Sequence, residues 1–301
     1  MTPSATPSAT PSATPSATTI DALLDRYDGV LLDAYGVLVD GRGLLPGAAA
    51  LLAELARRAT PFAIVTNDAS RSSVTYAARF AGYGVTVDPE RIVTSGSLLP
   101  AYFRDRGLAG ARTCVLGTAD SIGYVRDGGG VPVAPAPGMA IDAVAICDNA
   151  GTPFVAGIEL AFSAIVRAVE AGRVPALVLP NPDLIYPQGG GEYGFTAGAM
   201  ALLIEAGLAR KFPARTLRFD HLGKPAPHLF AEAQRRLGTT HVVMIGDQLE
   251  TDIAGAHAAG IDAALVAGVS RWEPPTVGAG IGSGAAPTYL LATIAPGVPA
   301  P

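Results

Sequence analysis

Short apolar runs rich in β-branched residues alternate along this chain with longer segments rich in Ala, Leu and Arg. The runs suit strands buried on both faces and the longer segments suit amphipathic helices, so the alternation predicts an α/β fold, a parallel sheet covered by helices. The predicted strands span residues 29–32, 62–65, 113–116, 143–146, 176–179, 242–245 and 263–266. The predicted helices span residues 48–59, 73–82, 159–171, 197–206 and 227–237.

Three of the predicted strands end in polar residues. Val-Leu-Leu stops at Asp33, Ala-Ile-Val stops at Thr66-Asn67, and Val-Val-Met-Ile-Gly stops at Asp247. Open α/β sheets bind their ligands just beyond the carboxyl ends of the strands. We therefore expect these polar residues to meet in one crevice.

Each residue near that crevice also has a purely structural interpretation. Asp33, before a glycine turn, could cap the turn, and Thr66 could cap the following helix. In the functional interpretation, Thr66 and the N–H groups after it bind a phosphoryl group. Lys224, in His-Leu-Gly-Lys-Pro-Ala-Pro, would neutralise both a phosphate and a carboxylate, whereas in isolation it would be a solvated surface charge.

An acidic loop follows the apolar strand at 242–245. Residues 246–252 read Gly-Asp-Gln-Leu-Glu-Thr-Asp, so several carboxylates lie close together. Clustered acids repel one another unless a cation or a hydrogen-bond network compensates. Mg²⁺, which favours one or two carboxylates together with water and phosphate oxygens, is the simplest compensation. The alternative is a polar loop in which Asp252 interacts with a helix dipole.

Composition narrows the classes of partner. A net charge of −5 without a Lys/Arg cluster argues against a nucleic-acid partner. No apolar run reaches the roughly 18 residues of a membrane helix, and no signal peptide is recognisable. The sparse cysteines, Cys114 and Cys147, fit a reducing compartment, so we expect a cytoplasmic protein. Residues 2–17 repeat Thr-Pro-Ser-Ala, which predicts a disordered tail over residues 1–20. Residues 274–301 should form an irregular end with one short element at residues 289–294.

The order Asp33, Thr66, Lys224 and then Gly-Asp-x-x-x-x-Asp resembles the haloacid dehalogenase-like (HAD) hydrolase superfamily. Residues 66–72, Thr-Asn-Asp-Ala-Ser-Arg-Ser, and residues 181–187, Asn-Pro-Asp-Leu-Ile-Tyr-Pro, resemble its NagD-like branch, subfamily IIA. The resemblance implies a Rossmann-like parallel-sheet core over residues 21–98 and 201–301. It also implies an inserted α/β cap domain of the C2 type at residues 99–200, which helps to select the substrate.

The resemblance further implies a Mg²⁺-dependent phosphatase acting on a phosphorylated small molecule. Asp33 would attack phosphorus to form an aspartyl-phosphate that water hydrolyses. The implied metal ligands are Asp33, the backbone carbonyl of Tyr35 and Asp247, together with Asp252, which would bind the ion directly or orient a metal-bound water. The implied phosphate- and substrate-binding residues are Thr66, Asn67, Lys224 and, from the cap, Asp148, Asn149, Asn181 and Asp183. The last two have an alternative role in ordering their own loop.

Tyr35 departs from the family pattern. Phosphatases of this superfamily generally carry a second aspartate two residues after the nucleophile, as general acid and then general base. Such a group is worth about 10² to 10⁴ in rate, so its loss should slow hydrolysis of alkyl phosphates. Tyrosine, with a reference pKa of about 10, can donate a proton but is a poor base at pH 7.

Several alternatives remain open at this point. The chain could be a phosphatase whose substrate has a leaving group that needs little protonation, or one that uses another acid such as Asp40 or a cap residue. It could instead be a phosphotransferase, form a long-lived aspartyl-phosphate, or only bind a phosphorylated metabolite. Asp33-Ala34-Tyr35-Gly36 also resembles the opening motif of metal-independent 2-haloacid dehalogenases. The acidic loop, which those dehalogenases lack, favours phosphoryl chemistry. The sequence does not fix the oligomeric state, and the resemblance allows a homodimer because caps of this branch often mediate dimers.

Overall fold

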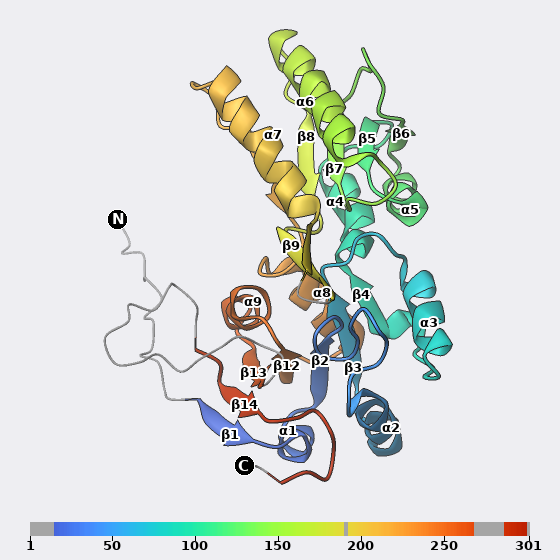
Figure 1. Cartoon of the computed structure of the whole chain (residues 1–301), viewed down its shortest axis with the longest axis vertical. Helices are drawn as coiled ribbons and strands as arrows, with labels where there is room; N and C mark the ends of the chain where they lie inside the picture. The colour runs from blue at the N-terminus through green and yellow to red at the C-terminus, as the bar shows by residue number, and fades with distance from the viewer. Residues whose placement is uncertain (1–14, 190–191, 268–285, 300–301) are drawn as a thin grey trace, which may run out of the picture.

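The computed structural model describes residues 15–189, 192–267 and 286–299, and in this part of the chain two parallel sheets form two lobes (Figure 1). The larger sheet has the strand order β1-β14-β13-β12-β2-β3-β4, and every neighbouring pair is parallel. Its strands are β1 (Ser16–Thr18), β2 (Gly29–Asp33), β3 (Phe62–Thr66), β4 (Ile92–Thr94), β12 (Val242–Gly246), β13 (Asp262–Val266) and β14 (Tyr289–Leu291).

The smaller sheet has the order β11-β8-β7-β5-β6 and is also parallel. Its strands are β5 (Arg112–Leu116), β6 (Val131–Val133), β7 (Ala143–Ile146), β8 (Ala176–Leu179) and β11 (Asp220–His221). A separate antiparallel hairpin joins β9 (Ile185–Gly189) to β10 (Glu192–Phe195). In Figure 1 the β9 label lies at the junction of the two lobes.

Helices cover both faces of the larger sheet. The side chains of α1 (Ile20–Arg26), α2 (Ala48–Arg58) and α3 (Ser73–Gly82) pack on one face, and those of α8 (His228–Leu237) and α9 (Ala254–Ala258) pack on the other. The amphipathic pattern explains this: in α2, Leu51 and Leu55 are fully buried while Arg57 faces solvent. The Ser72 side chain accepts a hydrogen bond from the backbone N–H of Thr75 and so caps α3.

The two lobes share an apolar core. Helices α4 (Leu99–Asp105) and α5 (Ala119–Asp127) contribute Phe103 and Val125 to a cluster that also contains Leu31 of the larger sheet and Val115 of the smaller one. The opposite face of the smaller sheet is covered by α6 (Phe154–Glu170) and α7 (Ala197–Lys211) (Figure 1). Because buried side chains run continuously between the sheets, packing fixes one lobe against the other.

The predicted α/β fold with a parallel sheet is confirmed. Each predicted strand forms, with its ends within one residue of the prediction, and so do helices α2, α3 and α8. Helix α6 begins five residues earlier than predicted and α7 ends five residues later. The prediction omitted the short elements α1, α4, α5, α9, β1, β4, β6, the β9–β10 hairpin and β11.

Two expectations, about the N-terminal tail and the insert, need correction, and the C-terminal end contains the short element expected there. Residues 1–14 of the tail predicted over residues 1–20 lie outside the described part. The end of that tail is ordered, because Ser16–Thr18 form a strand paired with β14. The predicted cap boundary at residue 200 is too early, because α7 continues to Lys211 and β11 joins the smaller sheet. The short element predicted at residues 289–294 forms as β14, and residues 274–285 and 300–301 of the predicted irregular end lie outside the described part.

No helix among the described residues is both long and apolar enough to cross a membrane.

Candidate active site

Three neighbouring strands place the candidate residues at one edge of the larger sheet. Strand β2 lies between β3 and β12, with Asp33 opposite Val65 and Leu32 opposite Ile245. The carboxyl ends are therefore level, and the side chains that follow them converge. Gly36, with φ of 101°, lets the loop after β2 approach Asp247: a Cβ on Gly36 would lie 2.3 Å from the Asp247 Oδ2.

Lys224 occupies the centre of the site. Its Nζ donates to Oδ1 of Asp33 at 2.5 Å and to Oδ1 of Asp252 at 2.6 Å, and all three side chains are buried. Burial opposes the charge on the ammonium group, but the two carboxylates outweigh this effect and raise the pKa of Lys224. The lysine is therefore a fixed buried cation, and the interpretation of a solvated surface charge was wrong.

Three carboxylates surround that single ammonium group. One oxygen from each of Asp33, Asp247 and Asp252 lies within 4.8 Å of the others. Burial, reinforced by the neighbouring carboxylates, raises the pKa of Asp247 to about 8. Burial and the charge of Asp252 raise that of Asp33 to about 7, against the effect of Lys224. Oδ1 of Asp247 is buried and accepts no hydrogen bond within the described chain. The cluster thus has an excess of negative charge that a cation would relieve.

Asp252 differs from the other two carboxylates because both of its oxygens have hydrogen-bond partners. Oδ1 accepts from Lys224, and Oδ2 accepts from the backbone N–H groups of Asp247 and Gln248 at 3.1 Å each. These bonds hold the acidic loop in a tight turn, and Asp252 is fully buried beneath it.

At the end of β3, Thr66 and Asn67 have different surroundings. The Thr66 hydroxyl accepts a hydrogen bond from the Asp68 N–H at 3.2 Å, and Thr66 lines the pocket described below. The amide of Asn67 donates to Oδ1 of Asp183 and to the carbonyl of Lys224, while its oxygen accepts from the Lys224 N–H. Since both amide hydrogens are used within the protein, the Asn67 side chain positions Lys224.

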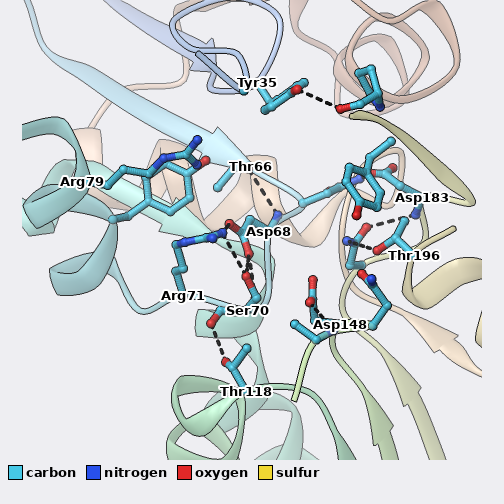
Figure 2. Close-up of a pocket in the computed structure, with 18 of the residues that line it drawn as sticks. Tyr35, Thr66, Asp68, Ser70, Arg71, Arg79, Thr118, Asp148, Asp183 and Thr196 are labelled. Atoms are coloured by element: carbon cyan, nitrogen blue, oxygen red, sulfur yellow. Dashed lines mark hydrogen bonds and ion pairs between the residues drawn. The ribbon is translucent and has the colours of Figure 1, made fainter. Parts of the chain in front are cut away.

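A cavity of about 800 Å³ extends from this edge of the sheet to the smaller lobe (Figure 2). Its walls include most of the residues predicted to touch a phosphorylated ligand, from both lobes: Asp33, Tyr35, Thr66, Asn67, Asp148, Asn149, Asn181, Asp183 and Lys224. Asp247 and Asp252 do not line the cavity, but they lie beside Asp33. The structure therefore brings all the predicted site residues to one region.

Tyr35 links the two lobes. Its hydroxyl donates a hydrogen bond of 3.0 Å to the carbonyl of Pro187 in β9, drawn as a dashed line in Figure 2. Burial, together with the charge of Asp40, raises the pKa of Tyr35. The phenol therefore stays protonated at neutral pH, with its proton directed at the hairpin.

Among the polar residues of the smaller lobe, Asn181 serves mainly to order its loop. Its Oδ1 accepts from the Asp183 N–H at 3.0 Å, and its Nδ2 donates to the Thr196 hydroxyl at 3.4 Å. Asp148 faces the cavity with Oδ1 bonded to the Ala150 N–H, and burial raises the pKa of its carboxyl.

Several pocket residues were absent from the sequence prediction. They are Asp68, Ser70, Arg71, Tyr76, Arg79, Thr118, Asp120, Tyr186 and Gln188. Thr118 and Asp120 follow the carboxyl end of β5, so the rule that identified Asp33 could have found them. Arg79 lies within α3, and nothing in the sequence distinguishes it from an exposed helical arginine.

The comparisons with known proteins agree with this arrangement. Residues 30–130 match the family model of the haloacid dehalogenase-like hydrolases, and residues 221–291 match a second, HAD-hydrolase-like model. A D-glycerol 3-phosphate phosphatase of Mycobacterium tuberculosis is 31% identical over 257 residues, covering 84% of this chain and 67% of that protein.

Solved structures are similar over most of the chain. A glycerol phosphate phosphatase from Mycobacterium tuberculosis in complex with magnesium is 29% identical, with a TM-score of 0.68, covering 83% of this chain and 70% of that one. NagD from E. coli has the same fold, with a TM-score of 0.69, 22% identity and coverage of 90% and 98%. The chain therefore belongs to the haloacid dehalogenase-like hydrolase superfamily.

Proposed function

We propose that this protein is a magnesium-dependent phosphatase that acts on a phosphorylated small molecule, with Asp33 as its nucleophile. One observation carries the proposal: a buried carboxylate, a buried lysine and an acidic pair meet at the carboxyl ends of adjacent strands, beside a cavity large enough for a metabolite. The relatives named as glycerol phosphate phosphatases support the reaction type and the size of the substrate.

The acidic cluster fits Mg²⁺. Asp247 offers a buried oxygen without a hydrogen bond, and Asp33 offers a second carboxylate next to it. We assign these two residues and the carbonyl of Tyr35 as ligands, and we assign Asp252 a positioning role because its oxygens are already bonded. When bound, Mg²⁺ would neutralise the negative charge that develops on the phosphoryl oxygens.

The protein side chains account for the bond changes. A carboxylate oxygen of Asp33 attacks phosphorus, and the bond from phosphorus to the ester oxygen breaks, with its electron pair leaving on that oxygen. Lys224 and Thr66 hold the transferring oxygens. Water then attacks the phosphorus of the aspartyl-phosphate, and the bond to Asp33 breaks, which restores the carboxylate and releases inorganic phosphate.

Tyr35 gives this chemistry a particular limitation. Its hydroxyl is bonded to the Pro187 carbonyl, so we infer that it connects the nucleophile loop to the hairpin and does not protonate the leaving group. The alcohol of an alkyl phosphate would then have to leave as an alkoxide, without a proton, which is slow. A leaving group of low pKa, such as a phenol, would not need the proton. Substituting Tyr35→Asp should raise the hydrolysis of alkyl phosphates, by up to roughly 10² to 10⁴.

The smaller lobe would act as the cap. We propose that the unit carrying β5 to β8, β11 and the β9–β10 hairpin closes the cavity and helps to choose the substrate. The support is that it supplies Asp148 and Asn149 to one wall and Ile185 to Gln188 to another.

The central experiment measures phosphate release from a panel of phosphate esters with and without Mg²⁺. We expect release by the natural chain only with Mg²⁺, and a loss of at least about 10³-fold in Asp33→Asn. Asp28→Asn is the control, because Asp28 is an exposed aspartate that pairs with His241 far from the cavity walls. Equal activity in Asp33→Asn and the natural chain would overturn the proposal.

Other outcomes of the same panel identify the alternatives. Tight binding of a phosphate ester without release from any ester would favour a binding protein. Metal-independent halide release from 2-haloacids would favour a dehalogenase. Phosphate release by Tyr35→Asp but not by the natural chain would show that the fold retains the site but that the natural chain lacks turnover.

A further inference from the structure

Among the described residues, three cationic side chains line the cavity, and they differ in their partners. Lys224 is bonded to Asp33 and Asp252, and Arg71 donates to the Asp68 carboxylate at 2.7 Å. Arg79 has no carboxylate partner within the described residues. The nearby Asp40 carboxylate is bonded to Arg42 and to the Gly43 N–H. Arg79 is thus a cavity cation whose charge the described protein leaves unpaired.

The Arg79 guanidinium is nevertheless held in place. Its Nε donates to the Tyr83 hydroxyl at 3.0 Å, and its Nη2 reaches the Asp40 carbonyl at 3.5 Å. Its Cζ lies 5.9 Å from the centre of the Tyr76 ring and 5.6 Å from that of Tyr83, so both rings contribute cation–π contacts. Figure 2 shows Arg79 on the α3 side of the cavity. Its Nη1 makes no hydrogen bond in the described chain.

Arg79 lines the same cavity as the residues proposed to carry the reaction. The Tyr76 ring packed against Arg79 is buried, and Tyr76 lines the same cavity as Thr66 and Asp33. The charge of Arg79 also lowers the pKa of Tyr35, although burial outweighs it. Arg79 therefore shares the cavity with Thr66 and Lys224, where the part of the substrate beyond its phosphoryl group could contact it.

We propose that Arg79 is a specificity residue that recognises a second anionic group on the substrate, a carboxylate or a second phosphate, at the end away from the transferred phosphoryl group. A guanidinium whose Nη1 makes no hydrogen bond in the described chain, and whose position is held by two tyrosines, is suited to hydrogen bonds with an oxyanion. This inference rests on the proposed phosphatase function and names the class of its substrate.

Matched ligands test the proposal. The carboxylate series is the O-phosphates of hydroxyacetate, 3-hydroxypropanoate and 4-hydroxybutanoate, each compared with its carboxamide. The phosphate arm compares 1,3-propanediol bisphosphate with 3-hydroxypropyl phosphate. Dissociation constants are measured by calorimetry in the Asp33→Asn background, so that turnover is not needed, and kcat/KM is measured in the active chain.

We expect the anionic member of at least one pair to bind more tightly, and Arg79→Gln to reduce that preference by roughly 10- to 100-fold while changing the neutral member little. Arg79→Lys keeps the charge without the planar fork and should retain part of the preference. Arg57→Gln, on the exposed face of α2, is the control for losing one positive charge and should keep all of it.

Each outcome bears on one hypothesis. Equal affinity for the members of every pair, or a preference unchanged by Arg79→Gln, would overturn the role of Arg79. A preference in one arm alone identifies the second anion as carboxylate or phosphate. Absence of turnover with an intact, Arg79-dependent binding preference would reject the phosphatase proposal and leave the binding specificity standing.

Discussion

Replacing Lys224 with Met should destabilise the fold far more than removing an ordinary surface charge. The Lys224 Nζ lies 2.5 Å from Oδ1 of Asp33 and 2.6 Å from Oδ1 of Asp252, and its side chain is only 3% exposed. Met has a similar length and fills much of the same volume, so the cavity term is small. The main loss is the cation that compensates two buried carboxylates.

The magnitude follows from that geometry. Removing one partner of a buried ion pair costs about 3–5 kcal/mol, because the other charge is left uncompensated. This is a large part of the roughly 5–15 kcal/mol that stabilises a typical domain. The carboxyls can escape part of the cost by binding protons. In the unfolded chain the same carboxyls have lower pKa values, so above pH 5 the folded variant holds more protons than the unfolded one. Raising the pH removes those protons, and the loss of folding free energy in the variant should therefore grow from pH 5 to pH 8.

Urea unfolding followed by far-UV circular dichroism, without Mg²⁺, measures this difference. Lys211→Met is the matched control, because Lys211 makes a half-exposed ion pair with Glu170 at 3.0 Å. Such pairs contribute about 0–1 kcal/mol, so the control should stay close to the natural chain. A Lys224→Met variant within about 1 kcal/mol of this control at pH 8 would refute the view that the lysine compensates a buried acidic cluster.

Asp247→Asn should stabilise the metal-free protein, because it removes a buried charge next to Asp33. It should also abolish stabilisation by Mg²⁺, and a thermal-shift titration that shows unchanged Mg²⁺ stabilisation would contradict the assigned ligand. Gly36→Ala should lower the free energy of unfolding by about 1–3 kcal/mol in urea, because the φ of Gly36 is 101° and an added Cβ would clash with Asp247. An unchanged free energy of unfolding would refute the need for glycine at this position. Burial lowers the pKa of His257, so as the pH falls the unfolded chain binds the proton first, and the folding stability should fall below about pH 6.5. In unfolding measurements at pH 5 to 7, His257→Asn should reduce this dependence of stability on pH. An unchanged dependence would exclude this histidine as its cause.

Much of the fold could be predicted because its signals are local. Strands such as β2 and β12 are buried on both faces and therefore appear as continuous apolar runs. Short elements such as β11 and β1 carry no such signal, since they form only because a neighbouring strand offers an edge. The extra turns of α7 depend likewise on Leu208 packing against the smaller sheet.

The sequence by itself determined the chemical groups and the edge of the sheet where they gather, because parallel strands carry Asp33, Thr66 and Asp247 to the same side. Only the tertiary structure decided what each group does there. It showed Lys224 buried between two carboxylates, Asn67 used to position it and Tyr35 bonded to the hairpin. It also placed Arg79 at the cavity with no carboxylate partner in the part of the chain that the structure describes. The physical reason is that charge pairing and burial depend on contacts between residues far apart in the chain, which no local pattern encodes.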